Sequence, residues 1–551
     1  MKRKGLTLLL SIFVAANLAA CSKTEEDAVG VSSAQADANV TEPGTLPVVK
    51  EKITLNLGVK DWRYVQDYET NAYTKWLEEQ TNIDLNFTLF PVAETMEKLR
   101  LQIASNSELP DVLINMGIPL SELSKYGSDG LVVDLKGYFD ESAYWSKDIF
   151  DKSLDPQYVR KSMTSYNGSM YFMPCYVEQT GNDYGRKAFI NKAWLDKLGL
   201  QIPETTQDLE NVLAAFRDND PNGNGKKDEI GITGSKNGWN ETVIPFLMNS
   251  FISDDVYYRM TVQNGTVAAA FNTEQWREGL RYMNRLAQNG LFDVQSFTQD
   301  GETLKTIAQN PDANIIGAVV TGSPDGLFST NFERMNEYVA LPPLKGPEGV
   351  AYAIKTNSPV NDGGIITKYC KNKLAAFRLL DFMMSEESAL RSRYGVPQQD
   401  WFPAEAGDVC MFESIGAEPK IRAVLPFQSV QNSHWYAMNP QFRSFDIANG
   451  IVWDGNELDG EYFKAKALEA YVGKEPEERI VTLIFNEEEQ EEYSSLETDI
   501  KEYVKESSAM FIIGQKDLDK DWDAYLDTLK SMKLDRFVEL AQIGYDRYNN
   551  N

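Results

Sequence analysis

The residues with the clearest chemical signature lie at positions 220–231, DPNGNGKKDEIG. With Asp220 as position 1, side-chain oxygens fall at positions 1, 3, 5 and 9, occupied by Asp220, Asn222, Asn224 and Asp228. An EF-hand loop takes calcium ligands from these positions. Carboxylate and amide oxygens are hard donors that suit calcium, and the glycines and proline prevent a regular helix or strand. The spacing therefore indicates a calcium loop.

The second half of this loop differs from an EF-hand. Gly225 stands at position 6, where the sharp turn needs glycine, but Gly231 replaces the usual Glu at position 12. Glu229 is the available substitute, and Lys226 would offer its backbone carbonyl. We expect calcium as a structural cofactor, and a solvated polar turn is the alternative. The expected ligands are Asp220, Asn222, Asn224, Lys226, Asp228 and Glu229.

Composition excludes several classes of function. The net charge of −28 argues against nucleic acid as a partner, because phosphates require Lys and Arg. The single histidine, His434, leaves no second imidazole for a His-rich metal site, and a His-dependent catalytic triad is nearly excluded. The four cysteines include no CxxC pair, which argues against structural zinc, so the oxygen-rich loop is the remaining candidate for a metal site.

The N-terminus indicates export. MKRKG is basic, and the apolar run that follows ends in Leu18-Ala19-Ala20-Cys21, which resembles a bacterial lipobox. We expect a signal peptide over 1–20, lipidation of Cys21, and a flexible tether over 21–50. The mature chain would then be held at the outer face of the bacterial cell membrane by lipid.

Periodicity from residue 53 onward alternates between strands and helices. The pattern predicts strands at 53–59, 83–90 and 111–116, with helices at 70–80 and 95–106. Such alternation is typical of a parallel α/β lobe. Ligands bind beyond the carboxyl ends of parallel strands, so residues directly after each strand are candidates for contact.

The rest of the chain predicts a second lobe and a helix-rich end. Long helices are expected at 205–219, 273–292 and 371–395, and the last hundred residues are strongly helical. We expect an α/β fold of two lobes over 51–551, with a hinged cleft between them. The N-lobe would hold roughly 51–165 plus a later segment, and the C-lobe roughly 185–345 plus C-terminal helices.

Several stretches together resemble the family 1 extracellular solute-binding lipoproteins of carbohydrate ABC importers. The stretches are LPDV (109–112), GSMYFMP (168–174), NKAWLDKLGL (191–200), TEQWREGLRYMNRLAQNGLFD (273–293) and WDAYLDTLKSMKLDRFVELAQIGYDRY (522–548). The resemblance implies a periplasmic-binding-protein-like fold and a monomer that is not an enzyme. It also implies capture of an oligosaccharide and its delivery to permease subunits. In relatives, loops comparable to 220–229 hold calcium.

One stretch departs from the family pattern. Relatives usually carry YG-x-E-G-x-x-W after the long helix, whereas this chain keeps Tyr394, Gly395 and Trp401 but has Pro397 and Gln398 in place of Glu-Gly. The departure puts the local loop shape, and with it the ligand, in question.

Sugars need aromatic platforms for their C–H faces and directed polar groups for their hydroxyls. Tryptophans after strands or in loops fit this role better than those on helical faces, although ordinary packing is the alternative for each. The candidates are Trp62, Arg63, Tyr64, Tyr171, Tyr184, Trp239, Trp401 and Trp435. Glu178 and Asp183 could accept hydroxyl protons.

Two other functions stay open from the sequence. A glycosidase or polysaccharide lyase needs only two carboxylates, and among 82 acidic residues such a pair carries no information. No G-x-S-x-G nucleophile motif occurs. A sugar sensor that does not transport would share every feature named above.

Overall fold

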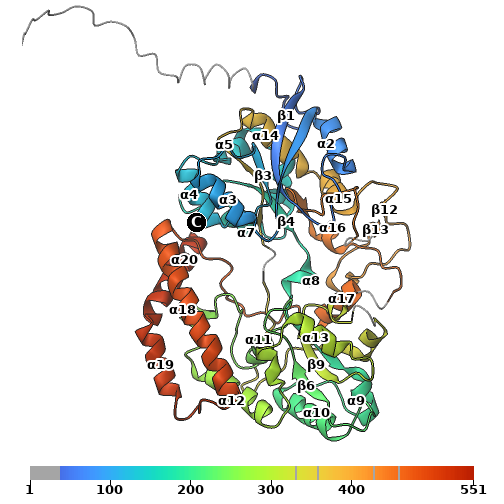
Figure 1. Ribbon diagram of the computed structural model, residues 1–551, viewed down its shortest axis with the longest axis vertical. Coiled ribbons are helices and arrows are strands. Elements are labelled where there is room, and N and C mark those ends of the chain that lie inside the picture. Colours follow the sequence, from blue (N-terminus) through green and yellow to red (C-terminus); the bar gives the residue numbers. More distant parts are fainter. Residues whose placement is uncertain (1–36, 329–331, 357–358, 426–428, 457–459, 551) are drawn as a thin grey trace, which may run out of the picture.

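The computed structural model describes residues 37–328, 332–356, 359–425, 429–456 and 460–550. The chain forms two lobes, one above the other along the long axis of the molecule (Figure 1). Each lobe has its own sheet and its own hydrophobic core. This confirms the predicted α/β fold of two lobes.

The N-lobe is built on a six-stranded sheet in the order β14-β4-β11-β3-β1-β2. Its strands are β1 (Ile53–Lys60), β2 (Ile83–Phe90), β3 (Val112–Ile114), β4 (Met173–Val177), β11 (Asn361–Ile366) and β14 (Gln441–Arg443). All pair in parallel except β11, which runs antiparallel to both neighbours. The carboxyl ends of the five parallel strands therefore meet at one edge.

The C-lobe is built on a four-stranded sheet in the order β10-β5-β9-β6. Its strands are β5 (Lys187–Asn191), β6 (Ile230–Thr233), β9 (Ile316–Thr321) and β10 (Tyr338–Leu341). β6 and β9 are parallel, whereas β5 runs antiparallel to β9 and β10. Two hairpin-like pairs lie outside the sheets: β7 (Met260–Gln263) with β8 (Thr266–Ala269), and β12 (Trp401–Pro403) with β13 (Ile421–Ala423).

Helices cover both sheets. Those of the N-lobe are α2 (Ala72–Thr81), α3 (Thr95–Ala104), α4 (Leu120–Ser128), α5 (Lys136–Ser142), α6 (Asp148–Lys152), α7 (Pro156–Met163), α14 (Lys373–Met383), α15 (Glu386–Tyr394) and α16 (Phe445–Asn449). Those of the C-lobe are α9 (Lys192–Leu198), α10 (Thr206–Asp218), α11 (Val243–Met248), α12 (Glu274–Gln288), α13 (Gly301–Ala308) and α17 (Gly460–Tyr471). None of the described helices is long and apolar enough to cross a membrane.

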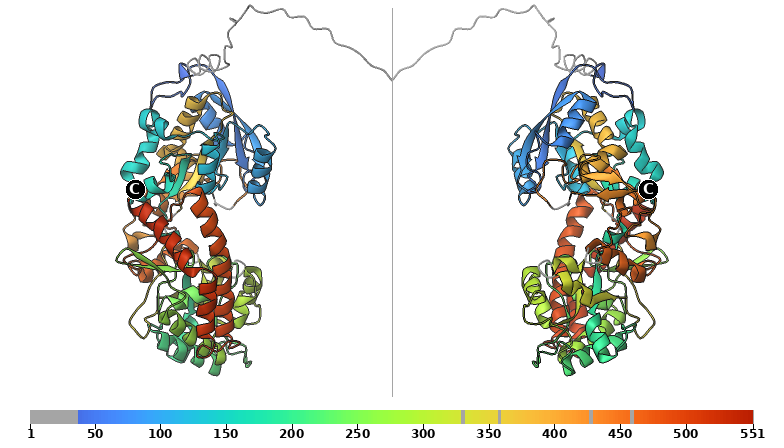
Figure 2. Two further views of the ribbon diagram at one scale, coloured as in Figure 1. Left: turned by 90° about the vertical axis from the view of Figure 1, so that its left-hand side faces the viewer. Right: turned by 90° about the vertical axis from the view of Figure 1, so that its right-hand side faces the viewer.

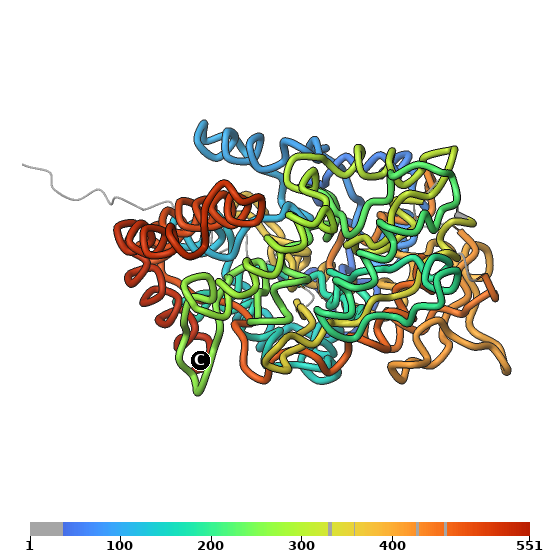
Figure 3. The backbone as a smooth tube through the Cα atoms, turned by 90° about the horizontal axis from the view of Figure 1, so that it is seen from below, coloured from blue at the N-terminus to red at the C-terminus, as the bar shows by residue number. Residues whose placement is uncertain are grey.

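The chain passes between the lobes three times: from β4 to β5 through α8 (Thr180–Asp183), from β10 to β11, and from β14 to α17. It ends in α18 (Glu487–Ile512), α19 (Trp522–Ser531) and α20 (Leu534–Asn550). These three helices lie together along one side of the molecule, and α18 spans from the C-lobe toward the N-lobe (Figures 2 and 3). Several crossings between two separate cores are the architecture of a hinge.

The tether ends earlier in the chain than we expected. Val40 and Val49 form a bridge, and Val48 and Val49 are fully buried in the N-lobe core. The amide of Val49 also donates to the carbonyl of Thr81 at 3.2 Å. Residues 37–50 therefore belong to the folded lobe because apolar burial fixes them. The signal peptide, Cys21 and the first part of the tether lie outside the described residues.

The long helix expected over 371–395 is two helices. α14 ends at Met383, and Ser385 caps α15 by accepting from the amide of Ser388 at 3.3 Å. A serine side chain competes with the helical backbone bond and favours a new N-cap, which the apolar periodicity did not reveal.

Candidate functional site

The strand ends of the two sheets are where a fold of this class binds its ligand. On the N-lobe, the carboxyl ends of β1, β3, β4 and β14 lie at one edge. On the C-lobe, β6 and β9 end at Thr233 and Thr321 and lead into the segments that carry Trp239 and Gly322. A hinged fold with two such edges encloses a ligand between them.

Trp62, Arg63 and Tyr64 lie together after β1. A tight turn sets their positions, because the amide of Val65 donates to the carbonyl of Trp62 at 2.9 Å. The guanidinium of Arg63 lies 4.6 Å from the ring centroid of Tyr64 and donates to its hydroxyl. Arg63 is exposed, whereas Trp62 and Tyr64 are half-buried. The turn therefore presents one cation and two aromatic rings at the N-lobe edge.

Tyr436 completes this aromatic group, and the sequence analysis missed it. Its ring stacks on Tyr64 with centroids 4.8 Å apart and lies 5.9 Å from Trp62. The backbone of Tyr436 has φ +57°, an uncommon conformation for a bulky residue. The sequence analysis singled out the neighbouring residues His434 and Trp435. Only the folded backbone shows that Tyr436 is the residue of the three whose ring contacts Trp62 and Tyr64.

His434 holds Tyr436 in place. The amide of Tyr436 donates to Nδ1 of His434 at 3.0 Å, so the imidazole acts as an acceptor there and carries its proton on Nε2. Burial, together with the charge of Arg393, lowers the pKa of His434 to about 4. The only histidine of the chain therefore stays neutral and supports the aromatic group from below.

The C-lobe edge offers Trp239. Its side chain is 53% exposed, which is high for a tryptophan. The ring lies against Gly322, where an added Cβ would come within 2.3 Å of it, and the carbonyl of Trp239 accepts from the amide of Gly322 at 3.1 Å. Because Gly322 has no side chain, the indole ring of Trp239 packs against its backbone. More than half of the Trp239 surface stays exposed to solvent.

A charged pair on α17 lies beside Trp239. The ammonium of Lys464 lies 5.8 Å from the ring centroid of Trp239 and forms an ion pair with Glu461. The C-lobe edge therefore carries a cation next to its exposed ring.

Three other predicted contacts are wrong in this structure, because their rings lie in the cores. Trp435 has no exposed surface and donates its indole N–H to Thr74 at 2.8 Å. Tyr171 is 4% exposed and packs in the N-lobe core. Trp401 is 8% exposed, packs beside Tyr394, and donates to the carbonyl of Gly395 at 3.1 Å. A ring without a free face cannot stack on a sugar.

Tyr184 is also buried, with 1% of its surface exposed, and its hydroxyl donates to Glu475 at 2.7 Å. The carboxylate of Glu178 accepts from the amides of Leu154 and Phe445 at 2.6 and 2.9 Å. Both side chains hold crossing segments together. Of the eight predicted ligand residues, Trp62, Arg63, Tyr64 and Trp239 keep exposed or half-buried side chains after strand ends, and their contact with a ligand stays a prediction.

The loop at 220–229 folds around its carboxylates. The amide of Gly225 donates to Oδ2 of Asp220 at 3.0 Å, and the amide of Lys226 donates to Oδ1 of Asn224 at 2.7 Å. Asp228 accepts from the side-chain amides of Asn222 and Asn224 at 3.1–3.2 Å. The backbone thus curls so that most predicted ligands are neighbours.

Two oxygens of the loop are buried without a hydrogen-bond partner, Oδ1 of Asp220 and Oε1 of Glu229. Burial, with smaller contributions from Asp228 and Asp220, raises the pKa of Glu229. Among the described residues, no group of three or more His, Cys, Asp or Glu side chains is arranged to hold a metal. The predicted ligands of the loop 220–229 include amide and backbone carbonyl oxygens as well as carboxylates. The unpaired carboxylate oxygens of Asp220 and Glu229 fit a cation.

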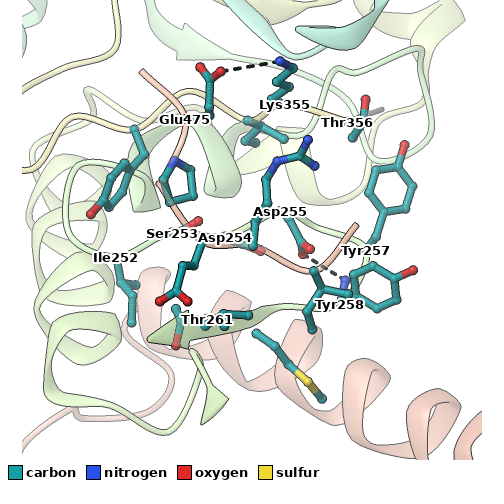
Figure 4. Close-up of a pocket in the computed structure, with 18 of the residues that line it drawn as sticks. Ile252, Ser253, Asp254, Asp255, Tyr257, Tyr258, Thr261, Lys355, Thr356 and Glu475 are labelled. Carbon is teal, nitrogen blue, oxygen red and sulfur yellow. Dashed lines mark hydrogen bonds and ion pairs between the residues drawn. The ribbon is translucent and has the colours of Figure 1, made fainter. Parts of the chain in front are cut away.

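A separate cavity of about 1320 Å³ lies beside the crossing segments (Figure 4). It is lined by the stretch from Phe251 to Gln263, by two crossing segments and by α18, and by none of the predicted ligand residues. Lys355 pairs with Glu475 at 3.5 Å across its upper side, and Asp254 and Asp255 are among the residues that line it. The cavity is therefore part of the hinge region.

Comparison with known proteins identifies the fold. FusA of Streptococcus pneumoniae, a fructooligosaccharide ABC transporter substrate-binding protein, is 26% identical over 489 residues, which cover 86% of each chain. A FusA structure, described as an EF-hand mutant in complex with fructo-nystose, matches with a TM-score of 0.67 at 23% identity, over 90% of this chain and 100% of that one. An extracellular solute-binding protein from Bifidobacterium longum subsp. infantis matches with a TM-score of 0.73 at 22% identity, over 90% and 98% of the two chains.

Residues 62–390, more than half of the chain, match the family of bacterial extracellular solute-binding proteins. The match begins at the aromatic turn after β1 and runs through both sheets to α15. Together with the two-lobed fold and the strand ends that face each other across a cleft, this confirms the resemblance seen in the sequence: the chain belongs to the bacterial extracellular solute-binding protein family.

Proposed function

We propose that this protein captures an oligosaccharide outside the cell and delivers it to the permease subunits of an ABC importer. The observation that carries the proposal is the aromatic surface at the strand ends of the two lobes: Trp62 and Tyr64, backed by the buried ring of Tyr436, and the exposed ring of Trp239. Flat aromatic faces suit the C–H faces of sugar rings. FusA, whose name states that it serves an ABC transporter for fructooligosaccharides, supports the same function.

The polar groups beside these rings suit a sugar as well. The indole N–H of Trp62 is buried without a hydrogen-bond partner in the described part of the chain, and Arg63 offers donors at the mouth of the cleft. Hydroxyl groups accept from both kinds of donor. Closure of the lobes would bring these groups onto the ligand and remove water from it.

Calorimetry with a panel of oligosaccharides tests the proposal. Binding of at least one oligosaccharide, with a change in tryptophan emission that is lost in Trp239→Ala, is the expected result. The oligosaccharide should stay intact in the same incubations, because we propose that the protein is a monomer that binds the sugar and does not cleave it. Depolymerisation of the sugar, or no heat and no emission change with any member of the panel, would overturn the proposal.

We further propose that Cys21 is lipidated and anchors the folded domain to the outer face of the cell membrane through residues 22–36. The lipobox-like Leu18-Ala19-Ala20-Cys21 and the burial of the chain from Val48 onward support this division. A Cys21→Ser variant should appear in the medium instead of the membrane fraction. Unchanged membrane association of this variant would contradict the anchor.

Calcium at the loop 220–229 is the third part of the proposal. The orphaned oxygens of Asp220 and Glu229 support it, and one FusA structure is described as an EF-hand mutant. The loop joins α10 to β6, and β6 leads to Trp239. An ion there would offset two of the three negative charges of Asp220, Asp228 and Glu229 and hold the strand that positions the C-lobe edge.

A further inference from the structure

The hinge cavity of Figure 4 plays no part in the proposed sugar site, and its walls come from both lobes. Tyr158 of α7 belongs to the N-lobe, and the stretch from Phe251 to Gln263 belongs to the C-lobe. Two crossing segments, 348–356 and 475–481, and helix α18 contribute further walls. With a volume of about 1320 Å³, the cavity exceeds the roughly 300–1,000 Å³ of most small-molecule sites, so it has room for an organic ligand.

The lining of the hinge cavity is acidic. Seven of the lining residues are Asp or Glu, whereas three are Lys or Arg. Two of these cations pair with lining carboxylates, Lys355 with Glu475 at 3.5 Å and Lys501 with Glu497 at 2.6 Å. The remaining carboxylates therefore outnumber the remaining cation, and the cavity attracts positive charge.

Asp254 supplies a buried carboxylate to this lining. Its side chain is 0% exposed, and Oδ1 accepts from the amide of Val256 at 2.9 Å, whereas Oδ2 has no hydrogen-bond partner among the described residues. The ion-pair partner of Oδ2, Nη1 of Arg259, lies 3.7 Å away, which is too far for a hydrogen bond, and it also lacks a hydrogen-bond partner. A buried carboxylate oxygen without a donor costs free energy that an N–H group of a ligand would recover.

Two exposed carboxylates of the cavity are also available. Glu348 and Glu477 come from the two crossing segments, and neither forms a hydrogen bond or an ion pair in the part of the chain that the structure describes. Glu478 differs, because it accepts from the amide of Gly265 at 3.1 Å. The cavity therefore combines one buried acceptor with two carboxylates that hold no cation of the protein.

Aromatic and aliphatic side chains form the rest of the lining. Tyr257 is 57% exposed and Tyr352 is half-buried, and neither ring contacts another ring or a cation among the described residues. Ile252 and Ile354 add apolar surface. Aromatic faces attract ammonium groups, and apolar side chains suit a methylene chain. The chemistry of the lining therefore matches a ligand with both kinds of group.

We propose that the hinge cavity is a second ligand site and that it binds an aliphatic diamine or polyamine. One ammonium group pairs with Asp254 and another with Glu348 or Glu477, while the methylene chain lies against Tyr257 and the apolar wall. Among the described residues, no three carboxylates are arranged to hold a metal ion, which favours an organic cation. The proposal is independent of the sugar site, because no predicted sugar contact lines this cavity.

Calorimetry on the sugar-free protein, with calcium held constant, tests the proposal. Spermidine and hexamethylenediamine would be titrated beside hexanediol, the neutral counterpart of the diamine, and beside magnesium, a compact dication. We expect spermidine to bind at one site, at least tenfold more tightly than hexanediol or magnesium. Its affinity should fall as sodium chloride is added, because salt screens the exposed part of the attraction.

Variants locate the amine in the cavity. Asp254→Asn, which keeps an acceptor for the amide of Val256, should weaken spermidine binding about tenfold. Glu348→Gln combined with Glu477→Gln should weaken it about three- to tenfold, because both pairs would be exposed. Circular dichroism would establish that each variant is folded, and the exposed pair gives the result even if Asp254→Asn unfolds.

A matched control separates the cavity from the general acidity of the chain. Glu108→Gln combined with Glu141→Gln removes two exposed carboxylates of the N-lobe that line none of the cavities described, so it should leave spermidine binding unchanged. Tyr257→Ala should weaken spermidine binding about threefold through loss of one aromatic face.

Each result decides the proposal. One-site binding of spermidine that the cavity variants weaken and the control pair does not weaken supports it. No binding of spermidine, equal binding of hexanediol or magnesium, or an equal loss in the control pair overturns it. None of these results bears on the proposed sugar function, because no oligosaccharide enters the titrations.

Discussion

The two edges of the cleft present aromatic surface in different ways. At the N-lobe edge, Trp62, Tyr64 and Tyr436 contact one another, and His434 and Trp435 support them from the core. At the C-lobe edge, Trp239 stands 53% exposed on Gly322. The N-lobe surface is therefore preorganised by packing, whereas the C-lobe ring depends on one flat contact and on the strand that leads to it.

The comparison predicts that the two edges respond differently to truncation. Trp435→Ala should destabilise the protein by about 3–5 kcal/mol, because it removes a fully buried ring that meets Tyr73 and Phe87 edge-on. Trp239→Ala, the matched tryptophan truncation at the other edge, should cost under about 0.5 kcal/mol. Urea unfolding of the two variants measures the difference, and equal losses would contradict the assignment of Trp435 to the core.

Removal of the calcium loop's carboxylates should affect the C-lobe edge through β6. Asp220→Ala with Asp228→Ala should abolish a calcium-dependent stabilisation, which is about 2.7 kcal/mol when calcium exceeds its dissociation constant about 100-fold. Without calcium, the variant should match the wild type. Thermal unfolding with calcium and with chelator checks this, and a wild type equally stable in both conditions would remove calcium from the account.

The N-lobe edge should depend on pH through His434. Its folded pKa of about 4 lies below the unfolded value of about 6.5, so only the unfolded chain binds the proton between these values. Stability from this group is full above pH 6.5 and is lost as pH falls toward 4, by about 2 kcal/mol between pH 7 and pH 5.

A His434→Gln variant provides the control for that pH dependence. Glutamine keeps an acceptor for the Tyr436 amide but does not titrate, so its stability should fall less than that of the wild type by about 2 kcal/mol over the same range. Urea unfolding of the wild type and the variant at pH 7 and pH 5 measures this difference. Parallel pH profiles would show that the histidine is not held neutral by the fold.

Ligand affinity should depend on the exposed ring of the C-lobe. Trp239→Ala should weaken oligosaccharide binding by about 1–2 kcal/mol, roughly tenfold, through loss of one stacking face. Tyr257→Ala is the matched control, because Tyr257 is 57% exposed but lines the hinge cavity of Figure 4. If Tyr257→Ala is the variant that loses affinity, the ligand occupies the hinge cavity and the cleft assignment fails.

The smallest expected effect concerns the surface under Trp239. An alanine at Gly322 would place Cβ about 2.3 Å from the ring, so the ring must tilt away and affinity should fall a few-fold. Gly326→Ala, four residues on, meets nothing within 4 Å and should leave affinity unchanged. Calorimetry separates the two, and identical affinities would show that the orientation of Trp239 does not matter.

Many elements of both lobes could be predicted from local sequence pattern. The strand predicted at 83–90 matches β2 residue for residue, and the helix predicted at 205–219 differs from α10 by one residue at each end. These elements have strong periodicity and local caps, such as the box formed by Thr205 and Asp208. The break inside 371–395 was missed because apolar spacing continues across it, while a single serine decides the local backbone.

The candidate ligand residues also divide into those whose position local sequence predicts and those whose position it does not. Trp62–Tyr64 and Trp239 could be placed at the cleft because they follow strands whose ends must face the ligand. Trp401 and Trp435 follow no such rule, since a loop tryptophan turns into the core or away from it according to distant partners such as Thr74. The stacking of Tyr436 on Tyr64 joins segments hundreds of residues apart.

The two-lobed α/β architecture, the lipobox-like N-terminus and the oxygen spacing of the loop 220–229 could be predicted from residue order, because they depend on periodicity, composition and short-range spacing. Which rings keep an exposed face, and which side chains meet, could be seen only in the folded chain. Those properties depend on where β1, α15 and β14 are brought together, and no residue records its long-range neighbours in its local sequence.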